Sequence, residues 1–350
     1  MKKRSVMLVV SVLLLAMSVG VASAQNNFET YQASIETFAG GVASSLPLNS
    51  SVGLNWSHAH IGNLPHFGVG AVIGFSTIPY AAVSPVLAAL GLQETLESNA
   101  NFSYIAEYGM PLPAYAVEAR VGGLILPFDV GVKFGAVPPG FDTNVLPDGL
   151  SFDYFMAGVD GRLRLNRGRF IVPTISVGGG YNILKASVGI AGLNDGPLTI
   201  NSFQDPREGG GEIDITLSNP SVEYFWTANV IDLKAHASWN LLLFTPYVGA
   251  GASLGFGSAG GALRSEITSP NFTDDDWAAI NAALAEAGEE SLPSFSNEGF
   301  SITAPMTGGW AMRLYGGVSV NLFIVKIDVT GMYDLLGGNY GLTLGTRIQL

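Results

Sequence analysis

The sequence predicts an all-β fold: an antiparallel transmembrane up-and-down β-barrel of about twelve strands, with fourteen as an alternative, and short helices in the N-terminal segment and the extracellular loops. Three observations carry this prediction. Charged residues make up only 13% of the 350-residue chain, and its mean hydropathy is positive at +0.34. Apolar residues alternate with small or polar ones along extended runs, and short connections alternate with long ones. After about residue 25 no apolar run reaches the roughly 18 residues that a membrane-spanning helix needs.

The composition excludes several classes of function. The chain carries 28 acidic and 16 basic residues, and its isoelectric point near 4.7 argues against nucleic acid as a partner. It has no cysteine, which excludes disulfides, thiolate nucleophiles and cysteine-bound zinc. We expect no cofactor.

Residues 1–24 have the three parts of a secretory signal peptide. Basic residues at positions 2–4 precede an apolar stretch, and Ala22-Ser23-Ala24 forms a small-residue cleavage site. We therefore expect cleavage before Gln25. The mature chain, residues 25–350, is expected to form a single exported barrel domain.

The alternation gives each run two different faces. In 130–135 every second residue is small or charged, and 159–165 places three charges on one face. A soluble sandwich also alternates, but its strands are mostly about 5–6 residues long. In a transmembrane barrel the apolar face meets lipid and the polar face meets the lumen. Aromatic residues near the run ends fit the interfacial girdles of such barrels: Trp56, Phe67, Trp239, Trp310, Tyr333 and Tyr340.

Eleven segments have this strand pattern. They are 50–61, 66–78, 112–126, 128–137, 150–165, 168–187, 221–239, 243–257, 308–322, 323–336 and 339–350. Tight connections (62–65, Pro127 and 166–167) alternate with long ones (79–111, 138–149, 188–220 and 258–307). Transmembrane barrels have short turns on one side and long loops on the other, whereas a sandwich has no reason to sort its connections in this way.

Residues 28–46 leave the strand count open. Apolar and polar residues alternate over 31–36, which would add a twelfth strand. Apolar residues also recur at spacings of three and four, which is typical of a helix that could plug the lumen. Residues 25–49 are therefore either a plug helix or the first strand. Two further helices are expected in long loops, over 86–97 and from Thr273 onwards.

Charged residues on the expected strands share the polar face, so the barrel prediction makes them candidates for lining the lumen. These candidates are Glu118, Arg120, Asp129, Lys133, Asp160, Arg162, Arg164, Asp232, Lys234, His236, Arg313, Lys326, Asp328 and Arg347. Charges in a narrow lumen must be paired or hydrated, because an unpaired buried ion is costly. Complete pairing would close the barrel, while charges separated across water would line a pore.

Acidic residues are concentrated in two long loops. Segments 188–220 and 258–307 contain thirteen acids and two bases. Such loops could attract cations or hold divalent cations between neighbouring carboxylates, or they could simply be a solvated surface.

Two motifs that occur in catalytic or metal-binding sites of other proteins are weak evidence for such a site in this chain. Gly251-Ala252-Ser253-Leu254-Gly255 matches the G-x-S-x-G pattern of hydrolases, but that mechanism needs a sharp strand-to-helix turn and this segment lies within an alternating strand. His58, His60 and His66 could contribute to a zinc or copper site, yet no carboxylate or further ligand is adjacent. We expect neither an enzyme nor a metal site.

The signal peptide, the alternating strands and a terminal strand that ends at Leu350 resemble bacterial outer-membrane β-barrel proteins. A helix before the first strand is also similar to the lumenal hatch of FadL-type transporters of hydrophobic substrates. The resemblance implies an outer-membrane location, with membrane lipid and the barrel-insertion machinery as partners. It also implies a porin-like channel or transporter for passive passage of small or hydrophobic solutes. The alternative is a structural or surface-interaction barrel with a closed lumen that acts through its acidic extracellular loops.

Overall fold

The computed structural model describes residues 28–61, 66–89, 103–123, 127–137, 150–168, 171–190, 198–204, 212–267, 278–279, 282 and 300–350. The expected signal peptide, the helix expected from Thr273 and most of the two acidic loops lie outside these residues or have no described side chains. Those expectations stay predictions.

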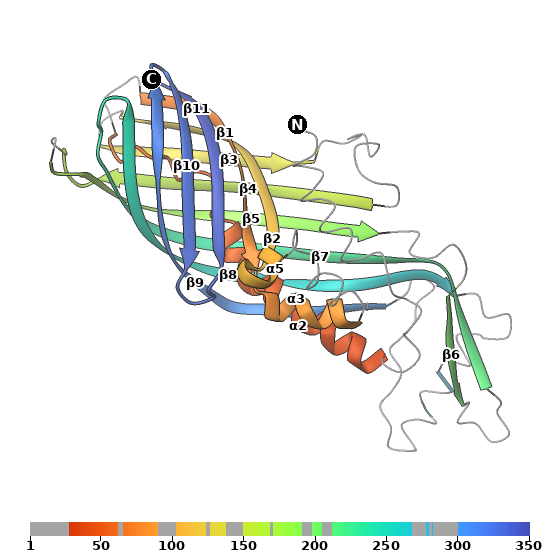
Figure 1. Cartoon of the computed structure of the whole chain (residues 1–350). Coiled ribbons are helices and arrows are strands. Elements are labelled where there is room, and N and C mark those ends of the chain that lie inside the picture. Colours follow the sequence, from red (N-terminus) through yellow and green to blue (C-terminus); the bar gives the residue numbers. More distant parts are fainter. Residues whose placement is uncertain are drawn as a thin grey trace.

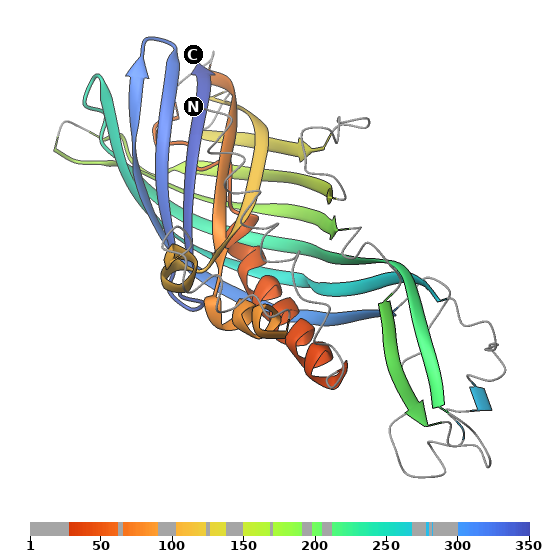
Figure 2. The same cartoon turned by 45° about the vertical axis from the view of Figure 1, so that its right-hand side comes forward.

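Ten antiparallel strands form a closed barrel (Figure 1). They are β1 (His66–Ile78), β2 (Met110–Gly122), β3 (Phe128–Ala136), β4 (Leu150–Arg164), β5 (Thr174–Ile190), β7 (Glu212–Ser238), β8 (Phe244–Ile267), β9 (Phe300–Leu322), β10 (Val325–Asp334) and β11 (Tyr340–Gln349). Each strand pairs with its neighbours in sequence, β1 pairs with β11, and β5 pairs with β7. The short β6 (Leu198–Gln204) pairs only with the outer end of β7 (Figure 2).

The strand alternation produces an apolar outside and a polar inside. In β11, Leu342, Leu344 and Ile348 are exposed on the outer face, whereas Thr343 and Arg347 are buried inside. The same alternation holds along β3 and β10. Exposed apolar side chains around a closed sheet are the outward band of a transmembrane barrel.

A charge on this outer band is expected to destabilise the protein in a membrane. Val132 lies in the middle of β3 and is 52% exposed on the outer face. We expect Val132→Arg to lower the free energy of unfolding by about 2–4 kcal/mol in phospholipid vesicles, because arginine is costly at the bilayer midplane. Ile171→Arg, in the exposed β4–β5 turn, is the control and should change it by less than about 1 kcal/mol. Equal effects would contradict the assignment of the outer face.

The two ends of the barrel differ as the sequence predicts. The connections β2–β3, β4–β5, β7–β8 and β9–β10 are short and lie at one end, which also holds the C-terminus (Figure 1). The other end carries the β5–β7 connection, which contains β6, the connections 79–109, 137–149 and 268–299, and the short β10–β11 turn. We call these the short-turn end and the long-loop end. The expected loops 188–220 and 258–307 were too long, because 198–204, 212–220, 258–267 and 300–307 belong to strands β6 to β9.

The expected number of twelve strands, or fourteen, is wrong, because the barrel has ten. Ten of the eleven expected strand segments form barrel strands. The exception is segment 50–61, which is not a strand. Its main chain contacts side chains of the barrel interior, and among the described residues it pairs with no neighbouring strand. Alternation alone does not distinguish a strand from an extended segment that a polar wall surrounds.

Helices precede and follow β1. Residues 28–46 form the helix alternative, within α2 (Phe28–Asn49). The loop helix α3 (Tyr80–Ala89) begins earlier than the expected 86–97, and Pro85 lies inside it; α5 (Ser103–Tyr108) precedes β2. None of the described helices is long and apolar enough to cross a membrane.

Candidate functional site: the filled lumen

The N-terminal chain runs through the barrel from the long-loop end to the short-turn end. Helix α2 lies at the long-loop end, where Ile35 packs on Gly261 near the outer end of β8. Residues 50–61, which we call the lumen segment, continue inward from the helix. At the short-turn end, Ile61 accepts a hydrogen bond from Arg164, the last residue of β4. The lumen segment therefore occupies the part of the lumen that polar wall residues surround.

The structure places twelve of the fourteen lumen candidates inside the barrel as buried side chains. Arg164 and Lys326 are the other two, and both are half-buried at the short-turn end. Asp334, which the sequence analysis missed, is also buried, and its carboxylate accepts hydrogen bonds from main-chain N–H groups at the β10–β11 turn. With it, the buried charges of the described residues comprise six acids and six bases: Glu118, Asp129, Asp160, Asp232, Asp328 and Asp334; Arg120, Lys133, Arg162, Lys234, Arg313 and Arg347.

One ion-pair cluster joins β2, β3, β4 and β7. Asp129 lies 2.5 Å from Arg120 and 2.6 Å from Arg162. Asp160 lies 2.5 Å from Arg120 and 2.7 Å from Lys234. Because all these side chains are at most 5% exposed, each charge is compensated by its neighbours.

A second set of pairs lies on β7 to β11. Arg313 on β9 contacts both carboxylate oxygens of Asp232, at 2.6 and 2.9 Å, and Ser253 donates a hydrogen bond to the same carboxylate. Arg347 on β11 pairs with Asp328 on β10. Two-point contacts between a guanidinium and a carboxylate fix the geometry as well as the charge.

The cations of the wall also bind the main chain of the lumen segment. The Lys133 ammonium donates to the carbonyls of Ser50 (2.5 Å) and Val52 (2.6 Å). Arg162 donates to the carbonyls of Trp56 (3.4 Å) and His58 (3.1 Å). These contacts satisfy main-chain acceptors that an extended segment outside any sheet would otherwise leave unpaired.

Leu54 marks a bend at which both main-chain groups are held by charged side chains. Its φ of 59° lies in the left-handed region, which costs a non-glycine residue roughly 1–2 kcal/mol. Glu118 accepts a hydrogen bond from the Leu54 N–H at 2.5 Å. Arg120 and Lys234 donate to its carbonyl at 3.2 and 2.9 Å. These charge-assisted bonds offset the cost of the bend.

Trp56 is not part of an interfacial girdle, as its position near a run end suggested, but is buried in the lumen at 2% exposed. Its ring lies 5.6 Å from the Arg120 guanidinium and 5.0 Å from that of Arg347. Its indole N–H donates to Glu118 at 2.6 Å. A large aromatic ring between two guanidiniums gains cation–π attraction, which explains why this residue of the segment turns inward.

Glu118 links the wall to the lumen segment twice, so its loss is expected to loosen the segment. In Glu118→Gln the negative charge is lost, and one carboxylate oxygen is replaced by an amide nitrogen, which cannot accept a hydrogen bond. Hydrogen bonds to charged groups contribute about 1.5–3 kcal/mol each. We therefore expect the Leu54 amide to exchange with solvent roughly ten- to hundredfold faster. Unchanged exchange would contradict the role of Glu118. Glu36→Gln, on the exposed side of α2, is the matched control.

The four histidines lie near the lumen segment or on it. His58 contacts the Thr245 hydroxyl at 3.2 Å, and the His236 ring contacts the Ser57 carbonyl at 2.8 Å. His66 at the start of β1 lies 3.7 Å from Asp129. Among the residues that the structure describes, no three His, Asp or Glu side chains form a cluster that could hold a metal ion.

The long-loop half of the interior is apolar. Helix α2 contributes Ile35, Phe38, Val42 and Leu46 to a buried hydrophobic cluster there. The wall contributes large apolar side chains, which are Met110, Leu112, Met156, Leu184, Tyr224, Trp226 and Val230. The lumen thus has an apolar half next to the long loops and a charged half next to the short turns.

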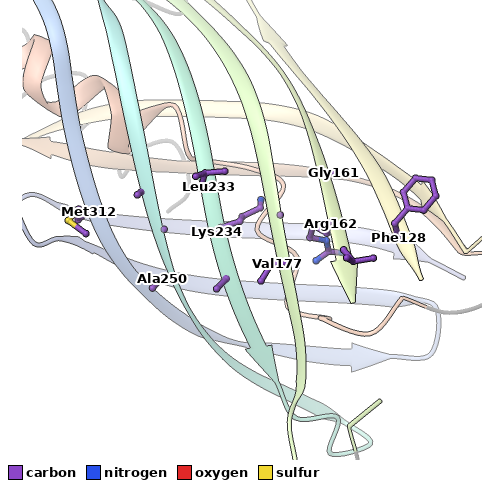
Figure 3. Close-up of a pocket in the computed structure, with 13 residues that line it drawn as sticks. Phe128, Gly161, Arg162, Val177, Leu233, Lys234, Ala250 and Met312 are labelled. Atoms are coloured by element: carbon purple, nitrogen blue, oxygen red, sulfur yellow. The ribbon is translucent and has the colours of Figure 1, made fainter. Parts of the chain in front are cut away.

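A pocket of about 770 Å³ lies on the barrel wall (Figure 3). Outward-facing Val177, Leu233 and Met312 surround it, and small residues such as Ala250 and Gly161 make it shallow. The strand pairing beneath it is continuous from β4 to β8. The pocket is therefore a depression in the outer face and not a lateral opening of the lumen.

Comparisons with known proteins give architectural similarity alone. No protein-family model and no curated protein matches the chain. The translocator domain of the autotransporter NalP from Neisseria meningitidis is similar at a TM-score of 0.32 and 10% identity, covering 90% of this chain and 99% of that one. For the transport unit of the autotransporter AIDA-I from Escherichia coli the TM-score is 0.34 and the identity 12%, with the same coverages. The toluene transporter TodX from P. putida gives 0.18 and 7%, covering 81% and 90%.

The assignment of the fold rests on the molecule itself. The sheet is closed, its outer face is apolar, its inner face carries the charges, and its connections are sorted by length between the two ends. These four features together are typical of transmembrane β-barrels. The chain has the fold of outer-membrane β-barrels, and its own N-terminal segment fills the lumen.

Proposed function

We propose that the protein is a porin-like outer-membrane channel or transporter for passive passage of small or hydrophobic solutes, and that the lumen segment is its gate. The observation that carries this proposal is the construction of the lumen. Its charged half is filled by a segment that belongs to none of the strands and is held through hydrogen bonds and ion contacts. Such contacts can be exchanged for water when the segment moves, whereas a strand cannot leave the sheet.

The apolar half of the lumen is the reason for proposing hydrophobic solutes as one substrate class. Side chains such as Met156, Leu184 and Trp226 would favour an apolar molecule over a charged one at this end of the lumen. Passage would then require displacement of the lumen segment from the charged half.

A disulfide staple tests the gate. The Ala59 N–H donates to the Ser238 hydroxyl at 2.9 Å, so these residues are neighbours on the segment and the wall. The chain has no cysteine of its own. We expect single-channel openings of Ala59→Cys/Ser238→Cys in planar bilayers to disappear on oxidation and to return on reduction. Each single variant is a control that should conduct under both conditions. Openings that persist in the oxidised, stapled protein would exclude the segment as the gate.

A second candidate function is surface interaction by a barrel that stays closed. β7, β8 and β9 contain 27, 24 and 23 residues, far more than the roughly 9–11 that cross a bilayer. Their outer parts and β6 extend well beyond the other strands at the long-loop end (Figure 2). This projecting sheet could present the acidic loops to divalent cations or to another surface. Absence of openings in both the reduced and the segment-deleted protein would favour this function.

The remaining sequence expectations are consistent with either function. We propose a location in the outer membrane after cleavage of the signal peptide, contact with membrane lipid and the barrel-insertion machinery, and no catalytic role.

A further inference from the structure

We infer that the charged half of the lumen is a binding site for an extended polypeptide, and that the beginning of α2 lies at the outer cell surface. The inference is independent of whether solutes pass. It rests on two separate observations: the groups of the segment that the wall contacts, and the direction in which the segment runs.

The wall contacts mainly the peptide backbone of its occupant. Lys133, Arg162 and Arg164 donate to main-chain carbonyls of the lumen segment. Arg120 and Lys234 both donate to the Leu54 carbonyl. Every residue of a polypeptide carries this acceptor, whatever its side chain. A wall that donates to carbonyls along an extended path therefore recognises polypeptide as a chemical class.

The side chains of the segment contribute fewer contacts. Trp56, Ser57 and His58 interact with the wall through the indole N–H, the hydroxyl and the imidazole, and the Ser51 hydroxyl contacts the Met332 sulfur. Asn55 lies 3.5 Å from the Lys234 ammonium, at the limit of a hydrogen bond. Recognition at the other carbonyl contacts is thus independent of which residue occupies the position.

The direction of the segment follows from its contacts in order. Gly41 of α2 packs on Ile78, the last residue of β1 at the long-loop end. Further along the chain, Ala59 contacts Ser238, the last residue of β7 at the short-turn end. The seven residues from Ile35 back to Phe28 add about 10 Å of helix in the outward direction. Figures 1 and 2 show the beginning of α2 on the same side as β6.

This direction sets the side of the membrane on which the N-terminal chain lies. Long loops of outer-membrane barrels are extracellular and short turns are periplasmic. The beginning of α2 therefore lies at the outer surface, and the barrel spans the membrane with ten strands and with one further polypeptide crossing in its lumen.

Cysteine labelling of intact cells tests the direction, because the chain has no cysteine to interfere. We expect Ala33→Cys, exposed on α2, to be fully shifted by a polyethylene-glycol maleimide that cannot cross the outer membrane. Leu336→Cys, exposed in the β10–β11 turn, is the control for the long-loop end, and Arg167→Cys, exposed in the β4–β5 turn, is the control for the short-turn end. The latter should shift only after permeabilisation. If Ala33→Cys behaves like Arg167→Cys, the inference is overturned.

A hydrophilic epitope inserted before Phe28 provides a second measurement that does not depend on one side chain. An antibody is expected to bind it on intact cells, while the same epitope inserted after Arg167 should require permeabilised cells. Binding to the first epitope only after permeabilisation would overturn the direction, even if the conductance of the stapled protein behaves as proposed above.

A pair of variants tests backbone recognition. Lys133→Met keeps the length of the side chain but removes the donor to two carbonyls. It should accelerate amide exchange in residues 50–54 at least tenfold, whereas His58→Ala, which removes a side chain of the segment that contacts Thr245 of the wall, should change it less than twofold. Equal acceleration in both variants would show that the wall recognises the side chains of this particular segment.

Discussion

Removal of residues 25–61 is expected to turn a barrel that opens only briefly into one that conducts steadily. The deletion takes away α2 and the lumen segment but leaves all ten strands, so the fold of the wall is retained. The side chains that now bind the segment, such as Lys133 and Arg162, would then be hydrated. Single-channel recording of the refolded deletion variant in planar bilayers should show stable steps, whereas the mature full-length protein should show only brief openings.

The same recording predicts the selectivity of the opened barrel. The described buried charges comprise six acids and six bases. We therefore expect a weak preference between cations and anions, in contrast to a strongly cation-selective pore that an acidic lumen would give. Heat-modifiable gel mobility is the control for folding. A folded deletion variant that stays silent would show that other parts of the chain close the lumen.

Asp129→Asn is expected to produce the largest loss of stability of any single substitution in the wall. Asp129 is fully buried and pairs with both Arg120 and Arg162. Its replacement leaves two buried guanidiniums with insufficient negative charge. Breaking a buried pair in this way costs about 3–5 kcal/mol. Urea unfolding in vesicles should show this decrease.

Asp153→Asn is the matched control for that substitution. Asp153 is exposed on β4 and accepts a hydrogen bond from the neighbouring Tyr154 N–H. This substitution should change the free energy of unfolding of the protein by no more than about 0.5 kcal/mol. A loss of less than about 1 kcal/mol for Asp129→Asn would indicate that water compensates the lumen charges.

The wall of the barrel was predictable from the sequence because its signal is local. Each strand alternates every two residues, and the two faces meet such different environments that Arg162 and Leu163 cannot be exchanged by a shift of register. The same alternation identified twelve of the buried lumen side chains. The sorting of short and long connections was likewise visible in the order of the chain.

The contents of the lumen were less predictable, because they depend on partners far away in the sequence. The lumen segment alternates like a strand, yet its hydrogen-bond partners are side chains from several strands rather than one adjacent strand. Trp56 looked like a girdle residue because it lies near the end of an alternating run. Its real partners were hidden, because the two guanidiniums that enclose it come from β2 and β11. The pairing of Asp160 on β4 with Lys234 on β7, which reaches across the intervening β5, had no signal in either strand alone.

The contact between Ser57 and Arg347 has a consequence for the kinetics of folding. These residues are 290 positions apart, and the hydroxyl of Ser57 accepts a hydrogen bond from the arginine at 2.7 Å. A hydrogen-bond network whose residues come from opposite ends of the chain cannot form until the last strand has joined the barrel. Folding rates fall as the sequence separation of contacting residues grows. The filled barrel is therefore expected to assemble late and slowly, with the N-terminal segment enclosed in the same step that pairs β1 with β11.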